Sequence, residues 1–461
     1  MTDDTEVAER PRARLSLKGA AFYLTAVCSA IFLLRLLGAS WSTQFPATWP
    51  DAVDPKQGYL AVAGKSPFRP SFYFAFRPIG YPTLLWVLGR RTQLTVVVQS
   101  ALYCGVIIAL CTTAFRVMRS RAVAIITTVV IVGIAVQAKY AMWNTQILSE
   151  SLAISLGFAA LAAWWRFAAA PTRGRARWGW AFTVAFLVTR DAHVLPVTIV
   201  IVPVALIVAA FGASLGSGIR RTMVAGAIIV TLTAGYSYTA QSAAHRATLS
   251  FHNVVGVRVL PDSELTRWFV ARGMPLDQAL RTRTGKSGLE DDFYKSRDPA
   301  FATYRHWARG AGPRALALSL VALAPHYAHL LNSDVPAIVA GDVHFYDTAG
   351  VYDRLPREMP LQLGGPSTRT GLAIWMGLGG AAVIVLFLLA IRRKRGLGLA
   401  VFGATALGLT LLELYTTWGG DPLEMERHLM GALSRLSVIL VVVIATAIDA
   451  SVSPAKVAVD G

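Results

Sequence analysis

Two aspartates and three arginines are the residues of this chain best suited to chemistry on a phosphate-bearing substrate. Asp51 and Asp54 lie three positions apart, and either carboxylate could accept the proton of a hydroxyl group. Arg77, Arg190 and Arg427 could each bind phosphate oxygens through two parallel hydrogen bonds. These residue types fit the attack of a hydroxyl group with departure of a phosphate.

The composition excludes an ordinary soluble enzyme. Of 461 residues, 54% are hydrophobic and 15% are charged, with a mean hydropathy of +0.50, whereas soluble domains carry about 25% charged residues. The net charge of +18 would favour nucleic-acid binding in a soluble protein. Here most basic residues flank apolar runs, so we expect membrane lipids as partners and no nucleic acid. Cys28, Cys104 and Cys111 lie inside apolar runs, which argues against a disulfide framework.

Apolar windows of about 20 residues predict an all-α integral membrane protein with about ten transmembrane helices. The first span is too long for a signal peptide and lacks a small-residue cleavage site, so we expect a retained anchor. The predicted spans are 17–38, 93–115, 120–140, 147–167, 177–190, 194–212, 222–241, 370–391, 396–417 and 431–449.

These spans divide the chain into five parts. They are a cytoplasmic tail (1–16), an N-terminal module of about seven spans (17–241) that includes a first outer loop (39–92), a larger extracytoplasmic loop (242–369), a C-terminal module of three spans (370–449) and a second cytoplasmic tail (450–461). We expect the first outer loop and the larger, helical loop to form the site together.

The distribution of basic residues predicts a multi-pass protein of the plasma membrane with both termini in the cytoplasm. Alternate connections are rich in arginine, and the short connections between them are not. The first outer loop departs from this rule, and cations kept on the outer side could meet an anion there. The predicted inner segments hold Arg10, Arg12, Arg14, Lys18, Arg116, Arg119, Arg121, Arg166, Arg173, Arg175, Arg177, Arg220, Arg221, Arg392, Arg393, Lys394 and Arg395.

The fifth predicted span is short. The apolar run from Trp178 to Thr189 covers roughly 20 Å, against about 30 Å for a hydrocarbon core. Arg190, Asp191 and His193 should therefore lie below the outer membrane surface. Ionisable groups at that depth are costly, so we expect them to face a wet cavity or one another.

The larger loop contains two helix-like stretches, 298–311 and 313–332. The second could pass for an eleventh span, but that would invert the later topology. We therefore predict an interfacial or re-entrant helix. His326 and His329 on this stretch could be combined on paper with Glu424, Glu426 and His428 into a metal site. A polar helix face is the simpler explanation, and we assign no metal ligand.

Five short segments carry a resemblance to a known family. Asp54 to Ala63 and Phe76 to Leu85, with its Arg77-Pro-Ile-Gly-Tyr-Pro run, resemble the first outer loop of the GT-C superfamily of membrane glycosyltransferases. Later segments resemble further motifs of that superfamily in the same order. They are Ile147 to Leu152 with its Ser-Glu, Phe186 to Arg190 with its Leu-x-x-Arg, and Glu426 to Leu429 with its Glu-Arg-His-Leu.

The resemblance implies a mannosyl- or arabinosyltransferase-like enzyme that takes a sugar from a polyprenyl-phosphate donor. An acceptor glycan, lipid or protein would receive the sugar at the outer face, by inverting displacement. It implies catalytic roles for Asp54 or Asp51. Some members of the superfamily use a divalent cation and others do not, so no cofactor is assigned. The residues implied to bind substrate or phosphate are Arg77, Tyr81, Glu150, Arg190, Glu426, Arg427 and His428.

Departures from the pattern and structural roles leave alternatives open. Asp51 and Asp54 are not adjacent, and His428 stands where tyrosine is common. Arg77 could anchor a helix at the lipid head groups, and Glu150 could simply interact favourably with the positive end of a helix dipole. Asp191 could neutralise Arg190. Two other functions are considered, an O-antigen-ligase or polymerase-like protein with essential groups in 242–369, and a secondary transporter or lipid flippase, which would often show paired internal repeats.

Overall fold

The computed structural model describes residues 25–35, 53–212, 215–288, 298–340, 352–355, 368–393, 396–423 and 425–452. Within these ranges every regular element is helical and no strand occurs. Two residues of interest, Asp51 and Glu424, lie outside the described residues, and Glu426 is described by its backbone alone.

Seven helical segments are long and apolar enough to cross a membrane. Two bent pairs add to these. The helix α7 (Arg121–Ala135) turns by 68° into α8 (Ala138–Ala141) and η1 (Met142–Thr145), and α17 (Gly312–Ala322) turns by 85° into α18 (Ala324–Ala340). The seven are α6 (Thr92–Val117), α9 (Ser149–Ala169), α11 (Val194–Phe211) with the preceding η2 (Asp191–His193), α12 (Ser217–Ala243), α19 (Arg369–Arg393), α20 (Leu397–Gly420) and α21 (Met425–Val452).

Length and composition therefore support seven spans, or nine if each bent pair is one span. The predicted number of about ten differs for two reasons. The helix α10 (Arg173–Leu187) has only 15 residues, and the first predicted span is described only over Thr25–Arg35. Nevertheless, a helix occupies part of each of the ten predicted segments.

The sharpest break comes at a proline. Pro325 has no amide hydrogen to donate to the carbonyl of Val321, and its ring would clash with that turn. The backbone at Leu323 leaves helical geometry, with φ −108° and ψ 26°. The stretch predicted as an interfacial or re-entrant helix is thus two helices at a large angle and not one straight span.

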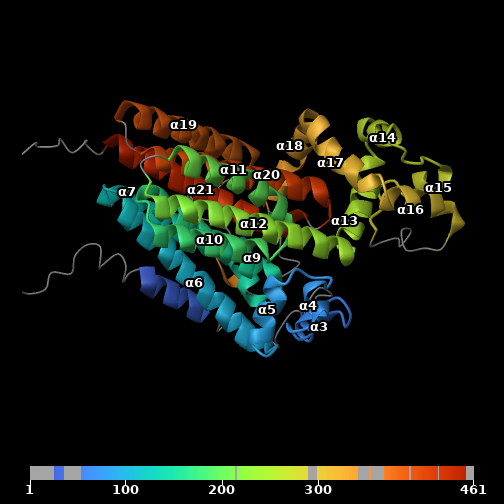
Figure 1. Cartoon of the computed structure of the whole chain (residues 1–461), viewed down its shortest axis with the longest axis horizontal. Helices are drawn as coiled ribbons and strands as arrows, with labels where there is room; N and C mark the ends of the chain where they lie inside the picture. The colour runs from blue at the N-terminus through green and yellow to red at the C-terminus, as the bar shows by residue number, and fades with distance from the viewer. Residues whose placement is uncertain are drawn as a thin grey trace, which may run out of the picture.

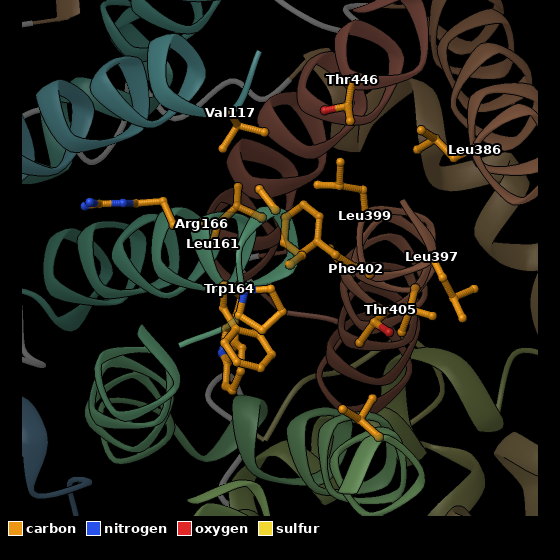
Figure 2. A pocket seen from close by; sticks show the side chains of 18 of the residues that line it. Val117, Leu161, Trp164, Arg166, Leu386, Leu397, Leu399, Phe402, Thr405 and Thr446 are labelled. Carbon is orange, nitrogen blue, oxygen red and sulfur yellow. The ribbon is translucent and has the colours of Figure 1, made fainter. Parts of the chain in front are cut away.

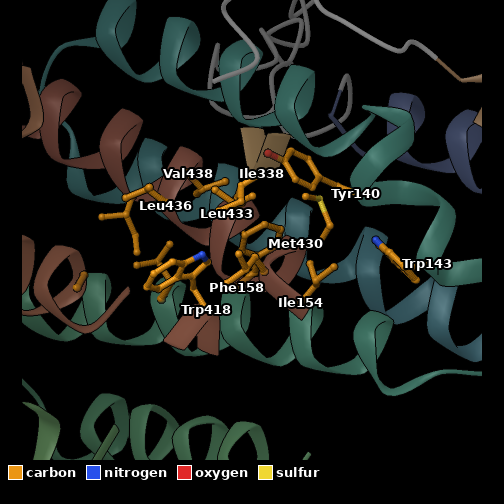
Figure 3. Packing of buried hydrophobic residues seen from close by; sticks show 14 of the residues in the cluster. Tyr140, Trp143, Ile154, Phe158, Ile338, Trp418, Met430, Leu433, Leu436 and Val438 are labelled. Carbon is orange, nitrogen blue, oxygen red and sulfur yellow. The ribbon is translucent and has the colours of Figure 1, made fainter. Parts of the chain in front are cut away.

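The helix α21 forms the centre of the bundle and is the most buried of the spans. It packs against α7, α9, α19 and α20, and α9 in turn packs against α6 and α10. Figure 3 shows residues of this core, among them Phe158 from α9, Trp418 from α20 and Met430 from α21, all without measurable exposure. Close packing of this kind, through dispersion contacts, is what holds helices together in a lipid environment.

The bundle has two different ends (Figure 1). The "loop end" carries short helices from both predicted outer segments. The "basic end" is the opposite one, where α6 ends and α9 meets α10, and it carries Arg116, Arg166 and Arg175. The short helices of the loop end are α3 (Tyr59–Ala63), α4 (Pro70–Tyr73), α5 (Gly80–Val87), α13 (Ala247–Asn253), α14 (Ser263–Val270), α15 (Gln278–Arg281) and α16 (Ala302–Arg309).

Candidate functional site

At the loop end, the first outer segment contacts the start of α9. The hydroxyl groups of Tyr59 and Ser149 lie 2.9 Å apart. The rings of Tyr59 and Tyr81 meet edge to face, with centroids 5.0 Å apart, and the Tyr81 hydroxyl donates to Gln99 on α6 at 2.6 Å. Both tyrosines are buried. The Asp54–Ala63 and Phe76–Leu85 motifs are therefore packed against the Ser-Glu motif.

The same segment is joined to the end of α10 through the backbone. The amide of Gly80 donates to the carbonyl of Val188 at 2.9 Å. A Cβ atom at position 80 would lie 2.8 Å from that carbonyl oxygen and 3.0 Å from the Cα of Thr189. Such distances are not tolerated without a backbone shift, so this close approach requires glycine. The Arg77–Pro82 run and the Leu-x-x-Arg motif are thus in direct contact.

A buried ion cluster joins the remaining motifs. Glu150, in the first turn of α9, accepts a hydrogen bond from Arg427 Nε at 2.7 Å and lies 3.6 Å from Arg190 Nη1. The Glu150 side chain has no exposed surface, and 13% of the Arg190 side chain is exposed. Because a buried charge is costly unless it is paired, this arrangement stabilises all three. One carboxylate against two guanidinium groups leaves one positive charge.

His428 adjoins this cluster and connects it to the larger loop. Its Nδ1 lies 3.9 Å from Asp421 Oδ2. Asp421 also accepts hydrogen bonds from Ser250 Oγ at 2.7 Å and Asn253 Nδ2 at 3.4 Å, both on α13. Residues of 242–369 thereby approach the start of α21.

The helix that contains the last predicted span begins before that span. We expected the Glu426–Leu429 motif in a loop before a helix at about 431, but α21 begins at Met425. A hydropathy window ends a predicted span at the first charged residues, because unpaired charges are more stable in water than in lipid. Here Arg427 is paired inside the protein, so the helix continues through it.

Asp54 lies at the surface of the same region. Its Oδ1 accepts hydrogen bonds from the amides of Gln57 at 2.6 Å and Lys56 at 2.8 Å. These two bonds lower the pKa of Asp54, and the positive charge of Arg77 lowers it further. The carboxylate is therefore ionised at neutral pH. Both bonds use Oδ1, so Oδ2 is the oxygen that could take a proton.

Arg77 connects this surface to the buried part. Its Nε donates to the carbonyl of Gln57 at 3.1 Å, while the Gln57 amide donates to Asp54. The guanidinium carbon of Arg77 lies 4.8 Å from the centre of the Tyr59 ring, a cation–π contact. A continuous series of contacts thus runs from Asp54 through Arg77 and Tyr59 to the start of α9.

We expected Arg190, Asp191 and His193 to face a wet cavity or one another, and each instead has an ionisable partner from another segment. Arg190 pairs with Glu150, and Asp191 Oδ2 lies 3.3 Å from Arg246 Nε. His193 Nδ1 lies 3.0 Å from Glu413 Oε1 in the middle of α20.

Sequence reasoning missed a second buried cluster, formed by His193, Glu413 and Arg435. Glu413 pairs with both His193 and Arg435. Phe186 stacks on the His193 ring at 3.9 Å, and the guanidinium carbon of Arg435 lies 4.6 Å from the Phe186 centroid. The signal was present, because Glu413 and Arg435 are charged residues well inside predicted spans, where an ionisable residue marks a functional or pairing site by default.

The larger loop has buried polar contacts of its own. His252 Nδ1 lies 2.6 Å from the Tyr304 hydroxyl, and burial lowers the pKa of His252 to about 4. Burial also lowers the pKa of Arg258 to about 10, although Asp334 lies 3.9 Å away. Arg258 lies over the Trp418 ring at 3.9 Å. These contacts fix the loop on α20.

The histidines considered for a metal have other surroundings. His326 lies 3.0 Å from Asp262 Oδ2 and 3.2 Å from Glu264 Oε2, while His329 is exposed. Among the described residues, no three His, Cys, Asp or Glu side chains form a group that could hold a metal ion.

Comparison of the chain with family models, with curated proteins and with solved structures gave no significant match. The resemblance to GT-C enzymes therefore rests on the sequence motifs alone. Of the residues singled out from the sequence, the structure gathers Arg77, Tyr81, Glu150, Arg190, Arg427 and His428 at the loop end, with Asp54 on the adjacent surface.

Proposed function

We propose that this protein is a GT-C-type membrane glycosyltransferase that moves a sugar from a polyprenyl-phosphate donor to a hydroxyl group of a glycan, lipid or protein. One observation carries the proposal. Four motif regions that are far apart in the sequence meet at one end of the bundle, through the Tyr59–Ser149, Gly80–Val188 and Glu150–Arg427 contacts.

In the proposed reaction, the Asp54 carboxylate removes the proton of the acceptor hydroxyl group. The acceptor oxygen attacks C1 of the sugar from the face opposite the phosphate. The bond between C1 and the phosphate oxygen breaks, the phosphate leaves with the electron pair, and the configuration at C1 is inverted. Asp51 is the alternative base.

The cations of the site have two proposed roles. Arg77 is accessible from the surface that carries Asp54, so we assign it to the leaving phosphate. Arg190 and Arg427 are held by Glu150 inside the protein. Their excess positive charge would stabilise the phosphate electrostatically from behind the tyrosines. We derive no step through a metal ion, because the described residues contain no group that would hold one.

The placement of the two loops supports an outer-face reaction in the plasma membrane. Both lie at the end opposite the arginine-rich one (Figure 1). By the positive-inside rule the basic end faces the cytoplasm, so both termini would lie there and the loop end would meet a lipid-linked donor outside.

The test is the transfer activity of Asp54→Asn, Asp51→Asn and the double variant in vesicles supplied with a polyprenyl-phosphate sugar. We expect replacement of the base to lower transfer by roughly 10²–10⁴-fold. Asp277→Asn is the matched control, since Asp277 in the larger loop also accepts a backbone hydrogen bond, from Leu280 at 2.8 Å. Full transfer by all three variants at normal membrane levels would refute the base assignment. Loss with Asp51→Asn alone would move the role to Asp51.

A further inference from the structure

A large cavity opens at the basic end, away from the proposed site. It has a volume of about 1750 Å³, larger than the roughly 300–1,000 Å³ of pockets for drug-sized ligands. Its walls are mostly apolar and come from α9, α10, α11, α20 and α21. Figure 2 shows Leu161 and Trp164 on one side of this space and Phe402 on another.

The mouth of the cavity is strongly basic. Arg166 lies within the electrostatic field of Arg116 and Arg175, and its side chain extends outward at the rim in Figure 2. Asp449 is the one carboxylate among the described lining residues. Its Oδ1 is engaged by the Ser120 amide at 2.6 Å. Five arginines line this part of the cavity, namely Arg116, Arg119, Arg166, Arg175 and Arg393.

The depth of the cavity matches one leaflet of a bilayer. On α21 its lining runs from Val452 to Arg435, and the part from Asp449 to Arg435 rises about 21 Å. Half of a hydrocarbon core is about 15 Å, and the head-group region adds to it. At the deep end Glu413 neutralises Arg435. The mouth therefore attracts an anion, and the deeper part favours hydrocarbon chains.

We propose that this cavity binds one anionic phospholipid from the leaflet at the basic end. Its phosphate would lie among Arg116, Arg166 and Arg175, and its acyl chains would run along Leu161 and Phe402 toward the middle of the membrane. A zwitterionic lipid has no net charge for the mouth to attract. A polyprenyl phosphate would place its phosphate at the end opposite the proposed glycosyl-transfer site, so it fits less well. Only this preference over polyprenyl phosphate rests on the proposed function; the binding of an anionic lipid at the basic mouth does not.

Competition between lipids tests the proposal. The full-length protein is stripped of lipid in detergent, offered an equimolar mixture of phosphatidylglycerol and phosphatidylcholine, and analysed by native mass spectrometry. We expect one tightly retained phosphatidylglycerol. Arg116→Gln combined with Arg166→Gln should reduce the preference roughly thirtyfold, since each basic group near a membrane surface contributes a roughly fivefold attraction. Arg121→Gln with Arg177→Gln is the matched control, because both arginines are exposed and lie outside the lining.

A second variant distinguishes lipid binding inside the cavity from lipid attraction to a basic surface. Ala160→Trp would fill part of the lining without changing any charge, and it should abolish retention while the protein stays monodisperse. Retention by Ala160→Trp, or absence of a phosphatidylglycerol preference in the wild type, would overturn the proposal. Displacement of phosphatidylglycerol by equimolar polyprenyl phosphate would overturn it in favour of a donor-lipid site. No sugar donor is present, so the result is independent of transfer activity.

Discussion

Two buried clusters in this protein have nearly the same composition but different surroundings. Glu150 pairs with Arg190 and Arg427, and Glu413 pairs with His193 and Arg435. The first cluster is covered by the first outer loop through Tyr59 and Ser149. The second lies deeper, under Phe186 and above the large cavity. An ion pair inside a membrane protein is therefore not enough to mark a reaction site; contact with a loop that can meet substrate is what distinguishes the first cluster.

The largest difference should appear when each carboxylate is neutralised. Glu150→Gln would release Arg190 and Arg427 from their fixed positions next to the first loop, and small displacements at a reaction centre can cost about 10²-fold in rate. We expect transfer to fall by about that factor. Glu413→Gln should leave transfer within a few fold of wild type. Transfer assays in vesicles, normalised to the amount of folded protein, make the comparison.

The same pair of variants also reports stability. Removing one partner of a buried ion pair typically costs about 3–5 kcal/mol, so both should unfold at lower temperature in detergent. Glu413→Leu with Arg435→Met, which removes both charges, should regain most of this loss. If Glu413→Gln lost transfer as completely as Glu150→Gln did, the distinction between the clusters would fail.

A smaller effect is expected at Gly80, which joins the first loop to the end of α10. An added methyl group would meet the Val188 carbonyl at 2.8 Å and push the Arg77 segment away from the Glu150 cluster. We expect Gly80→Ala to lower transfer about tenfold or more. Gly105→Ala is the control, because nothing lies within 4 Å of a Cβ atom there. Equal activity of the two variants would show that the loop does not need this contact.

A further prediction concerns stability instead of transfer, namely the pH dependence of stability at the loop end. Burial lowers the pKa of His252 to about 4, from an unperturbed value of about 6.5. The folded protein thus keeps His252 neutral while the unfolded chain binds a proton. The contribution of His252 to the free energy of unfolding is fully present above about pH 6.5 and is lost as the pH falls toward 4. The total loss is about 3 kcal/mol. Thermal unfolding of the wild type and of His252→Gln across this pH range measures this loss. Unfolding temperatures that fall equally with pH in the two proteins would contradict the assignment.

The pH dependence of transfer should differ from that of stability. The pKa of Asp54 lies below its ordinary value, so the base is already ionised well below neutral pH. If Asp54 is the base, as proposed, transfer by the folded protein should therefore not change with the ionisation of Asp54 between pH 8 and 6.

Much of the fold could be predicted from the sequence, because apolar runs must be helical in a bilayer. The short α10 and its recessed Arg190 followed from the spacing of two arginines. The beginning of α21 did not, since its charged first turn is stabilised by Glu150, which lies 277 positions away from Arg427. Only the folded structure reveals such a partner.

The candidate site was predictable to a similar extent. The motifs gave Tyr81, Glu150, Arg190 and Arg427, and these residues do lie at one end of the bundle. Glu413 was overlooked because a hydropathy window averages one charge with about twenty apolar neighbours. The break before α18 could have been placed at Pro325, but its 85° angle depends on packing that the sequence does not display.

The shortness of α10 has a consequence for the lipid around the protein. Its 15 residues cover about 22 Å, yet Trp178 and Ala181 face outward from it. A hydrophobic surface shorter than the hydrocarbon core is accommodated by local thinning of the bilayer. At the loop end, the head groups beside α10 should therefore sink toward the middle of the membrane. A lipid-borne phosphate arriving there would start closer to Arg77 and Tyr59 than it would anywhere else along the protein's perimeter.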